Sequence, residues 1–226
     1  MRFSEGRTAM PVITKISEQK RRENRRNVYL DGAFAFGCNL NVVAKFRLRE
    51  GLNVTAEKVA EILAGEVRQE AFDYAMKSLE RRLHSKAELS KKLAKREYDA
   101  KTIELVLADL ERMGYVDDAR FARTKATAAA KYKHHGHRRA RLELMKAGVD
   151  DATARKAIET VYDPHDSLAV ARALAQKQAP RLRKLDPIVA RRRLVGMLGR
   201  RGFDYETIRP VIDEVLGYHH DKREDE

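Results

Sequence analysis

Positively charged side chains are the groups in this sequence whose number and spacing fit a definite chemistry. The stretch Ala119–Leu142 contains eight Lys or Arg residues and no Asp or Glu. The stretch Ala171–Arg201 contains ten Lys or Arg residues, opposed only by Asp186. Guanidinium and ammonium groups bind phosphates through charge-assisted hydrogen bonds. These two stretches therefore predict a surface that binds a phosphate backbone.

The composition of the whole chain also favours a polyanionic partner. Its 226 residues include 47 Lys and Arg against 34 Asp and Glu, which leaves a net charge of +13 and a pI near 9.9. Such a charge favours nucleic acid, a nucleoprotein or, less often, a membrane surface. The single cysteine, Cys38, cannot form an internal disulfide, and no apolar run reaches the roughly 18 residues of a membrane span. We therefore expect a soluble cytoplasmic protein without a membrane segment.

Other reactive side chains do not form a catalytic or metal-binding motif. His134, His135 and His137 are close in sequence, but their spacing matches no standard zinc site, and a solvated basic turn explains them better. Asp117 or Asp118 is better explained as the cap of a following helix than as a metal ligand. Because phosphate-binding loops, nucleophile motifs and paired carboxylates with a nearby base are also missing, we expect neither an enzyme nor a cofactor.

An internal threefold repeat carries these cations. Tyr98, Val149 and Phe203 are each followed at once by Asp, and the copies are 51 and 54 residues apart. In every copy the positions five and nine before, and five, eight, nine and twelve after, are apolar. These residues are Leu89, Leu93, Ile103, Val106, Leu107 and Leu110; Ala140, Leu144, Ala154, Ala157, Ile158 and Val161; and Leu194, Leu198, Ile208, Val211, Ile212 and Val215. The spacing is helical, so each copy predicts two helices that share a core.

The turn between the two helices has its own signature. Gly148 and Gly202 stand just before the aligned apolar residue, where glycine can end a helix in a left-handed conformation. The following Asp can cap the next helix. The first copy has Glu97 at this position, so we expect its turn to be strained or differently shaped.

One further helix fits before each pair, at about residues 71–83, 119–131 and 167–178. Ser85 with Glu88 predicts a capping box for the second helix of the first copy, and Asp186-Pro187 predicts the start of the equivalent helix in the third. Each copy is therefore predicted to be a three-helix module. Because one module alone buries little apolar surface, neighbouring modules should stack.

The N-terminal region follows a different pattern. The segments 28–30 and 34–36 flank Asp31-Gly32, a dipeptide that favours two-residue hairpin turns, and residues 13–16 could add a third strand. Residues 39–46 predict a short helix, and residues 55–83 predict a longer one that could break near Gly65. The predicted organisation is a disordered start (1–10), a β-hairpin element with a short helix (11–54), modules 1 (55–117), 2 (118–163) and 3 (164–217), and a disordered tail (218–226).

The second helix of every module carries cations at equivalent positions. Like charges repeated in register repel one another, and we expect them to have no internal ion pairs, which favours a phosphate-facing surface over a merely solvated one. The candidate residues are Lys91, Lys92, Lys95, Arg120, Arg123, Lys131, Lys133, Arg138, Arg139, Arg141, Arg191, Arg192, Arg193, Arg200 and Arg201.

The middle of the chain resembles the signature of the RecX family. The resemblance rests on Gly114–Ala122 (GYVDDARFA), on Gly136 with Arg138-Arg139, and on Leu144 and Gly148-Val149. It extends over roughly residues 11–217. Two positions depart from the family pattern: Glu97 replaces the usual Gly, and Ala140 replaces a larger aliphatic residue.

The resemblance implies an all-α protein in which three three-helix modules form an elongated, curved array behind a small β-hairpin element. It implies a non-enzymatic regulator that lies along the RecA–DNA filament, limits its growth, and restrains strand exchange and the RecA-stimulated self-cleavage of the SOS repressor. The sequence itself leaves the oligomeric state open, and we expect a monomer. Its partners would be RecA, the RecA–single-stranded DNA filament and DNA phosphates. Two alternatives are an autonomous DNA-binding protein and a nuclease, the latter disfavoured by the missing carboxylate cluster.

Overall fold

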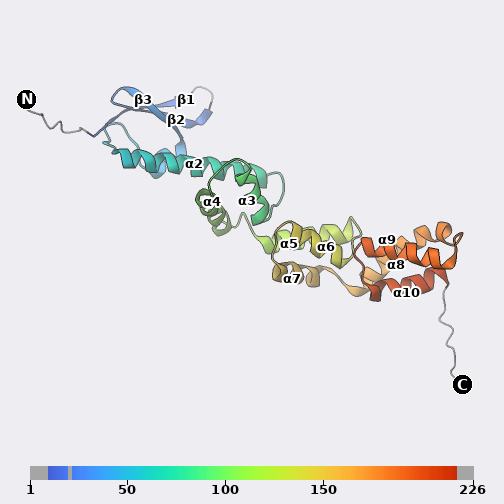
Figure 1. Ribbon diagram of the computed structural model, residues 1–226. Coiled ribbons are helices and arrows are strands. Elements are labelled where there is room, and N and C mark those ends of the chain that lie inside the picture. Colours follow the sequence, from blue (N-terminus) through green and yellow to red (C-terminus); the bar gives the residue numbers. More distant parts are fainter. Residues whose placement is uncertain (1–9, 20–21, 218–226) are drawn as a thin grey trace, which may run out of the picture. The chain divides into compact units, whose positions relative to one another are not determined.

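A computed structural model describes residues 10–19 and 22–217 of the chain. Figure 1 shows an N-terminal antiparallel sheet followed by helices. The chain divides into two compact units: residues 1–82 with 89–113, and residues 83–88 with 114–226. The predicted disorder at residues 1–9 and 218–226 lies outside the described residues. None of the described helices is both long enough and apolar enough to cross a bilayer.

The predicted N-terminal β-element is confirmed as a three-stranded sheet. Strands β1 (Ile13–Gln19), β2 (Arg22–Leu30) and β3 (Ala33–Asn39) pair in that order, antiparallel. Asp31 and Gly32 have φ values of 49° and 84°, as the tight turn between β2 and β3 requires. The sheet packs against α1 (Leu40–Lys45) and α2 (Ala56–Leu79), with Val28 and Ile62 fully buried between these elements.

Helix α2 joins the sheet to the first module within one unit. It is continuous over 24 residues, so the expected break near Gly65 does not occur. A Cβ atom at Gly65 would stand 2.6 Å from the Phe46 ring, which explains the glycine by close packing instead. The buried carboxylate of Glu66 accepts a 2.6 Å hydrogen bond from the Asn39 N–H and lies 2.9 Å from the Arg25 guanidinium. Burial raises the pKa of Glu66, and this contact with Arg25 opposes the shift.

The predicted three-helix modules are confirmed. The first consists of the end of α2, α3 (Lys86–Ala94) and α4 (Ala100–Arg112); the second, of α5 (Asp118–Lys131), α6 (His137–Lys146) and α7 (Asp151–Val161); the third, of α8 (Pro164–Leu182), α9 (Pro187–Arg200) and α10 (Tyr205–Leu216). Of the twenty-one aligned apolar residues, all are buried except Tyr98 and Val161, which are half-buried. The repeat therefore encodes the module cores.

The predicted helix starts are confirmed by their hydrogen bonds. Asp99, Asp150 and Asp204 cap the third helix of their modules by accepting N–H bonds of 2.8–2.9 Å from the residue three positions on. That residue is Thr in all three copies, a regularity that the sequence analysis overlooked. The Ser85 hydroxyl oxygen accepts a hydrogen bond from the Glu88 N–H at 3.0 Å at the start of α3, and the Asp186 carboxylate accepts one from the Ile188 N–H at the start of α9. Asp117, and not Asp118, caps α5.

Glu97 occupies the same left-handed conformation as its glycine equivalents. Its φ is 64°, against 80° at Gly148 and 89° at Gly202, so the first turn is strained but not differently shaped. A residue with a Cβ atom loses about 1–2 kcal/mol in this conformation.

We therefore expect Glu97→Gly to stabilise the first unit by about 0.5–1 kcal/mol, because relief of strain outweighs the greater flexibility of unfolded glycine. Glu104→Gly is the matched control: it removes the same charge from an exposed helical position and should destabilise α4 by about 1 kcal/mol. Amide hydrogen exchange in α3 and α4 measures both effects. Equal destabilisation by the two variants would contradict the prediction.

Candidate basic interaction surface

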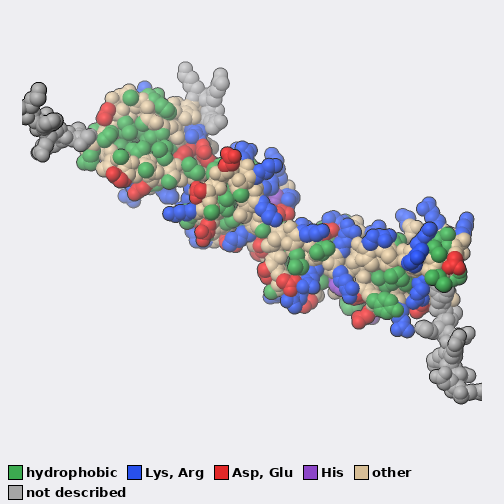
Figure 2. Space-filling model, in the orientation of Figure 1, with side chains coloured by type: hydrophobic (Ala, Val, Ile, Leu, Met, Phe, Trp, Pro, Cys, Tyr) green, Lys and Arg blue, Asp and Glu red, His purple; other side chains and the backbone are tan. Residues whose placement is uncertain are grey.

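The fifteen candidate cations lie mainly on the second helices of the modules, where they were predicted. Lys91 and Lys92 are on α3 and Lys95 follows it; Arg120, Arg123 and Lys131 are on α5. Lys133 is in the next turn, Arg138, Arg139 and Arg141 are on α6, and Arg191, Arg192, Arg193, Arg200 and Arg201 are on or at the end of α9. Eleven are exposed; Lys92, Arg141, Arg191 and Arg201 are half-buried. In the second unit, Lys and Arg side chains gather over α6 and α9 (Figure 2).

The expectation that these cations have no internal ion pairs is wrong for four of them, and two more donate to backbone carbonyls. Arg141 forms an ion pair with Asp151, Arg191 lies 3.7 Å from Asp213, and Arg120 donates to the carbonyls of Gly114 and Tyr115. Lys133, Arg139 and Arg201 are engaged at the junction between the second and third modules. The sequence pattern missed these contacts because the acceptors lie on other helices or on the backbone, outside the charge runs.

The junction between modules 2 and 3 is built by backbone contact. The turn at residues 200–202 lies against the first turn of α6: the Gly136 N–H donates to the Arg201 carbonyl at 2.8 Å, and the Arg138 N–H to the Gly202 carbonyl at 3.1 Å. The Arg139 side chain donates to the Arg200 carbonyl, and the Arg201 side chain to the Lys133 carbonyl. These guanidinium groups stabilise the stacking of the modules.

A similar contact lies elsewhere within the second unit, between residues 85–87 and the turn at residues 147–149. The turn at residues 147–149 lies against the first turn of α3, where the Ser85 hydroxyl donates to the Ala147 carbonyl at 2.5 Å. A Cβ atom at Gly148 would stand 2.2 Å from the Cβ atom of Ala87. In both places the glycine turn of a module meets the start of the preceding second helix. The predicted stacking of neighbours is thus confirmed for modules 2 and 3, which lie in one unit.

Glu143 is the charged centre of the junction. Its carboxylate lies 3.4 Å from Lys133, 3.5 Å from Arg139 and 3.2 Å from the Nδ1 atom of His135. Burial alone would raise the pKa of Glu143, but Lys133, His135 and Arg139 together lower it. Burial, and then the charge of Arg139, lower the pKa of His135, and the Glu143 carboxylate opposes this shift. Glu143 therefore offsets part of the positive charge of Lys133 and Arg139.

The histidines are not simply a solvated turn. His135 is half-buried, its carbonyl accepts the Tyr162 hydroxyl at 3.0 Å, and His137 lies 3.7 Å from Asp204. Burial raises the pKa of Tyr162 to about 12, so this phenol stays a donor. Within the described ranges, no three His, Cys, Asp or Glu side chains lie close enough together to hold a metal ion. We interpret His135 and His137 as packing groups of the junction, whereas the His134 side chain is exposed.

Nine of the fifteen cations form no ion pair or side-chain hydrogen bond with another residue of the described part of the chain. These nine are Lys91, Lys92, Lys95, Arg123, Lys131, Arg138, Arg192, Arg193 and Arg200. A cation that forms no ion pair or side-chain hydrogen bond within the described residues can bind an anion without first losing such a contact. We call these nine the unpaired cations.

A small antiparallel sheet followed by three three-helix modules with cation-rich second helices defines a modular helical protein. Profiles of the RecX family match the chain along most of its length: the regulatory protein RecX N-terminal domain at residues 11–55, and the first, second and third three-helix domains of RecX at 71–110, 117–158 and 165–212. The chain belongs to the RecX family of regulatory proteins.

Individual relatives agree with this assignment. The regulatory protein RecX of Levilactobacillus brevis is 33% identical over 203 residues, which are 90% of this chain and 76% of the relative. That of Bacillus licheniformis is 30% identical over 206 residues, 91% of this chain and 78% of the relative. A crystal structure of regulatory protein RecX shares the fold with a TM-score of 0.79 at 24% identity and covers 90% of this chain and 99% of its own. The RecX structure from Lactobacillus salivarius has a TM-score of 0.63 at 21% identity, over 68% of this chain and 99% of its own.

Proposed function

We propose that this protein regulates RecA by binding the RecA–DNA filament through its basic helical surface. Binding would inhibit recombinase and co-protease activity and limit filament growth, without catalysis by the protein itself. The observation that carries the proposal is the set of unpaired cations on or near the second helices of a RecX-family fold. A nucleoprotein filament presents phosphates at regular intervals, and repeated cations can neutralise several of them at once.

The proposal assigns different roles to the cations that have internal contacts and to the unpaired cations. Arg139, Arg141 and Arg201 hold helices and modules together, so they shape the surface without facing the ligand. The unpaired cations supply the ligand contacts. Such a protein needs no partner copy to expose its surface, so we propose that it acts as a monomer, in the cytoplasm with RecA.

The test is a triple substitution of unpaired cations in the second module, Arg123→Ala with Lys131→Ala and Arg138→Ala. Each phosphate contact removed should lower the slope of log affinity against log salt by about one. We therefore expect weaker inhibition of the DNA-dependent ATPase and strand exchange of RecA, with a salt slope reduced by about two to three. Filament binding at several salt concentrations measures this slope.

The control variant carries Lys146→Ala, Lys156→Ala and Arg209→Ala, which remove the same charge from exposed positions of the same unit that are outside the candidate set. Its inhibition should match that of the unchanged protein. Equal weakening by both variants would mean that net charge, not this surface, sets the affinity. Affinity for naked DNA equal to that for the filament would support an autonomous DNA-binding protein and contradict the proposal.

A further inference from the structure

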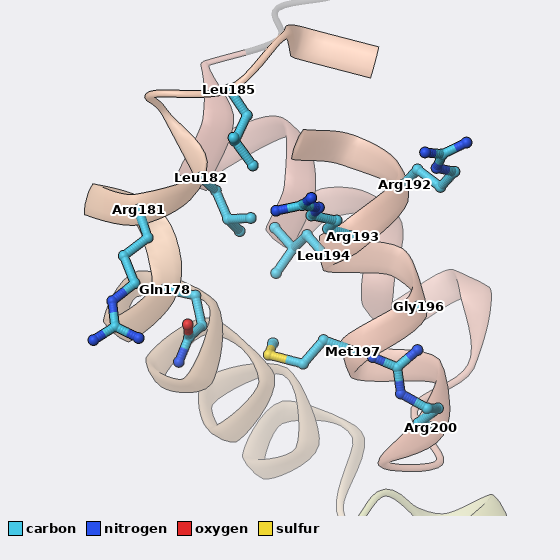
Figure 3. Close-up of a pocket in the computed structure, with 10 residues that line it drawn as sticks. All are labelled: Gln178, Arg181, Leu182, Leu185, Arg192, Arg193, Leu194, Gly196, Met197 and Arg200. Carbon is cyan, nitrogen blue, oxygen red and sulfur yellow. The ribbon is translucent and has the colours of Figure 1, made fainter. Parts of the chain in front are cut away.

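An arginine-lined pocket opens in the third module, between the end of α8 and one face of α9 (Figure 3). It encloses about 540 Å³, within the range of about 300–1,000 Å³ that ligand pockets have. Arg181 and Gln178 reach it from α8, and Arg193 and Met197 from α9; Arg193 points toward Leu182 and Leu185. The pocket lies wholly within one module.

The rim of this pocket is strongly positive. Four exposed arginines line it: Arg181, Arg192, Arg193 and Arg200. None of the four has a carboxylate within 4.0 Å among the described residues. Arg191, next to them on α9, turns instead toward Asp213 of α10. The planar guanidinium group favours two parallel hydrogen bonds to a carboxylate or a phosphate, so the rim is suited to a ligand with several spaced anionic groups.

The floor of the pocket is aliphatic. It consists of Leu182, Leu185, Leu194 and Met197, of which Leu185 and Met197 are half-buried and offer apolar surface to a ligand. No aromatic side chain is among the described residues that line it, so the stacking platform that holds bases of single-stranded nucleic acid is missing. The polar edges of a base on this floor would face leucine and methionine, and apart from the Gln178 amide only the rim guanidinium groups could bond to them. An aliphatic or aromatic side chain would leave no polar group unpaired there.

We propose that this pocket binds an acidic peptide segment of a partner protein, in which one large apolar side chain fills the floor and flanking Asp or Glu carboxylates pair with the rim arginines. The inference rests on the proposed function and deepens it, because it assigns this part of the basic surface to a protein contact instead of a DNA contact. Charge complementarity on the rim provides attraction, and the floor provides selectivity for the apolar residue.

The experiment uses the full chain and an array of nine-residue peptides. Each peptide of the array has a single Leu, Met or Phe at one position, and its other residues are Asp, Glu and Ser. In one set of matched peptides Asn and Gln replace the acidic residues, and in a second set Ser replaces the apolar residue. We expect binding only when both features are present. Arg193→Glu and Arg181→Glu should each weaken the selected peptides at least tenfold, and Leu185→Ser should remove the preference for the apolar residue.

Arg209→Glu is the control, because Arg209 is an exposed cation of the same module outside the pocket; it should change peptide affinity less than twofold. A nine-nucleotide oligothymidylate is tested in parallel with every variant. Peptides that bind without an apolar residue, or that bind Arg193→Glu as well as the unchanged protein, would overturn the inference. The inference would also be overturned if the pocket variants lost affinity for the oligonucleotide but not for the peptides. Because these assays contain no RecA, failure here would leave the proposed filament inhibition standing, and the ATPase assay decides that separately.

Discussion

Gly202→Ala should destabilise the junction of the second and third modules by about 2–5 kcal/mol, the sum of about 1–2 kcal/mol for a left-handed residue with a Cβ atom and about 1–3 kcal/mol for overpacking. Gly202 has a φ of 89°, and an added Cβ atom would stand 2.3 Å from the Arg139 backbone nitrogen. Backbone atoms cannot rotate away as a side chain can. The turn must withdraw, and the two backbone hydrogen bonds across the junction must lengthen or break.

Two other glycines of the same module separate the contributions to this effect. Gly217 has a φ of 76° but no neighbour within 4 Å of an added Cβ atom, so Gly217→Ala should lose only the backbone contribution of about 1–2 kcal/mol. Gly199 lies within α9, and a Cβ atom added there would also have no neighbour within 4 Å. Because alanine favours a helix more than glycine does, Gly199→Ala should stabilise α9 by up to about 1 kcal/mol. Hydrogen exchange of the amides in α6 and α9 measures all three, with the sheet of the first unit as internal reference. If Gly202→Ala lost no more protection than Gly217→Ala, the modules would not be docked through this turn.

This junction also marks the limit of what the sequence could predict. The periodic apolar positions and the capping Asp residues identified the module cores and the helix starts, because those features depend on residues close in sequence. The glycines predicted the left-handed turns correctly. The sequence did not show that Gly202 lies against Arg139, because that contact joins residues distant in the chain and depends on how two finished modules meet.

The assignment of the cations shows the same limit in the candidate site. The charge run in the second module contains no acid, so it predicted cations without partners. Asp151 and Glu143 lie just beyond the run, and the folded helices bring both back to it. The sequence did not single out Arg181 for a different reason. The candidate cations were sought mainly on second helices, and Arg181 lies at the end of α8, the first helix of its module, although it belongs to the same basic stretch. Helical periodicity gives the face of a residue, but not its partner on the next helix.

The division into engaged and unpaired cations changes which substitutions can test function. Replacing Arg138, Arg139 and Arg141 together would remove one unpaired cation and two structural ones. Loss of inhibition would then mix loss of ligand contact with loosening of the junction. Replacing Arg123, Lys131 and Arg138 avoids this, because none of the three forms a side-chain contact that the fold requires. Substitutions that test the surface should therefore be chosen by whether a cation has an internal contact, and not by where it lies in the charge run.

Leu144→Ala should destabilise the second module by about 2–5 kcal/mol, toward the upper end of the range for a buried leucine. Leu144 is fully buried in a core otherwise rich in alanine, including Ala126, Ala140 and Ala154. Alanine has no flexible side chain that could move into the cavity, so the space that Leu144 leaves should stay largely empty.

Leu142→Ala is the matched control on the same helix, since Leu142 is 51% exposed and should cost less than about 0.5 kcal/mol. Exchange of the amides in α5, α6 and α7 under native conditions reports both variants without assuming that the two units unfold together. Leu144 shares this core with two other large buried side chains, Phe121 and Ile158, but unlike them it is fully buried. Equal protection in the two variants would show that alanine packing alone suffices, and that Leu144 is not the centre of this core.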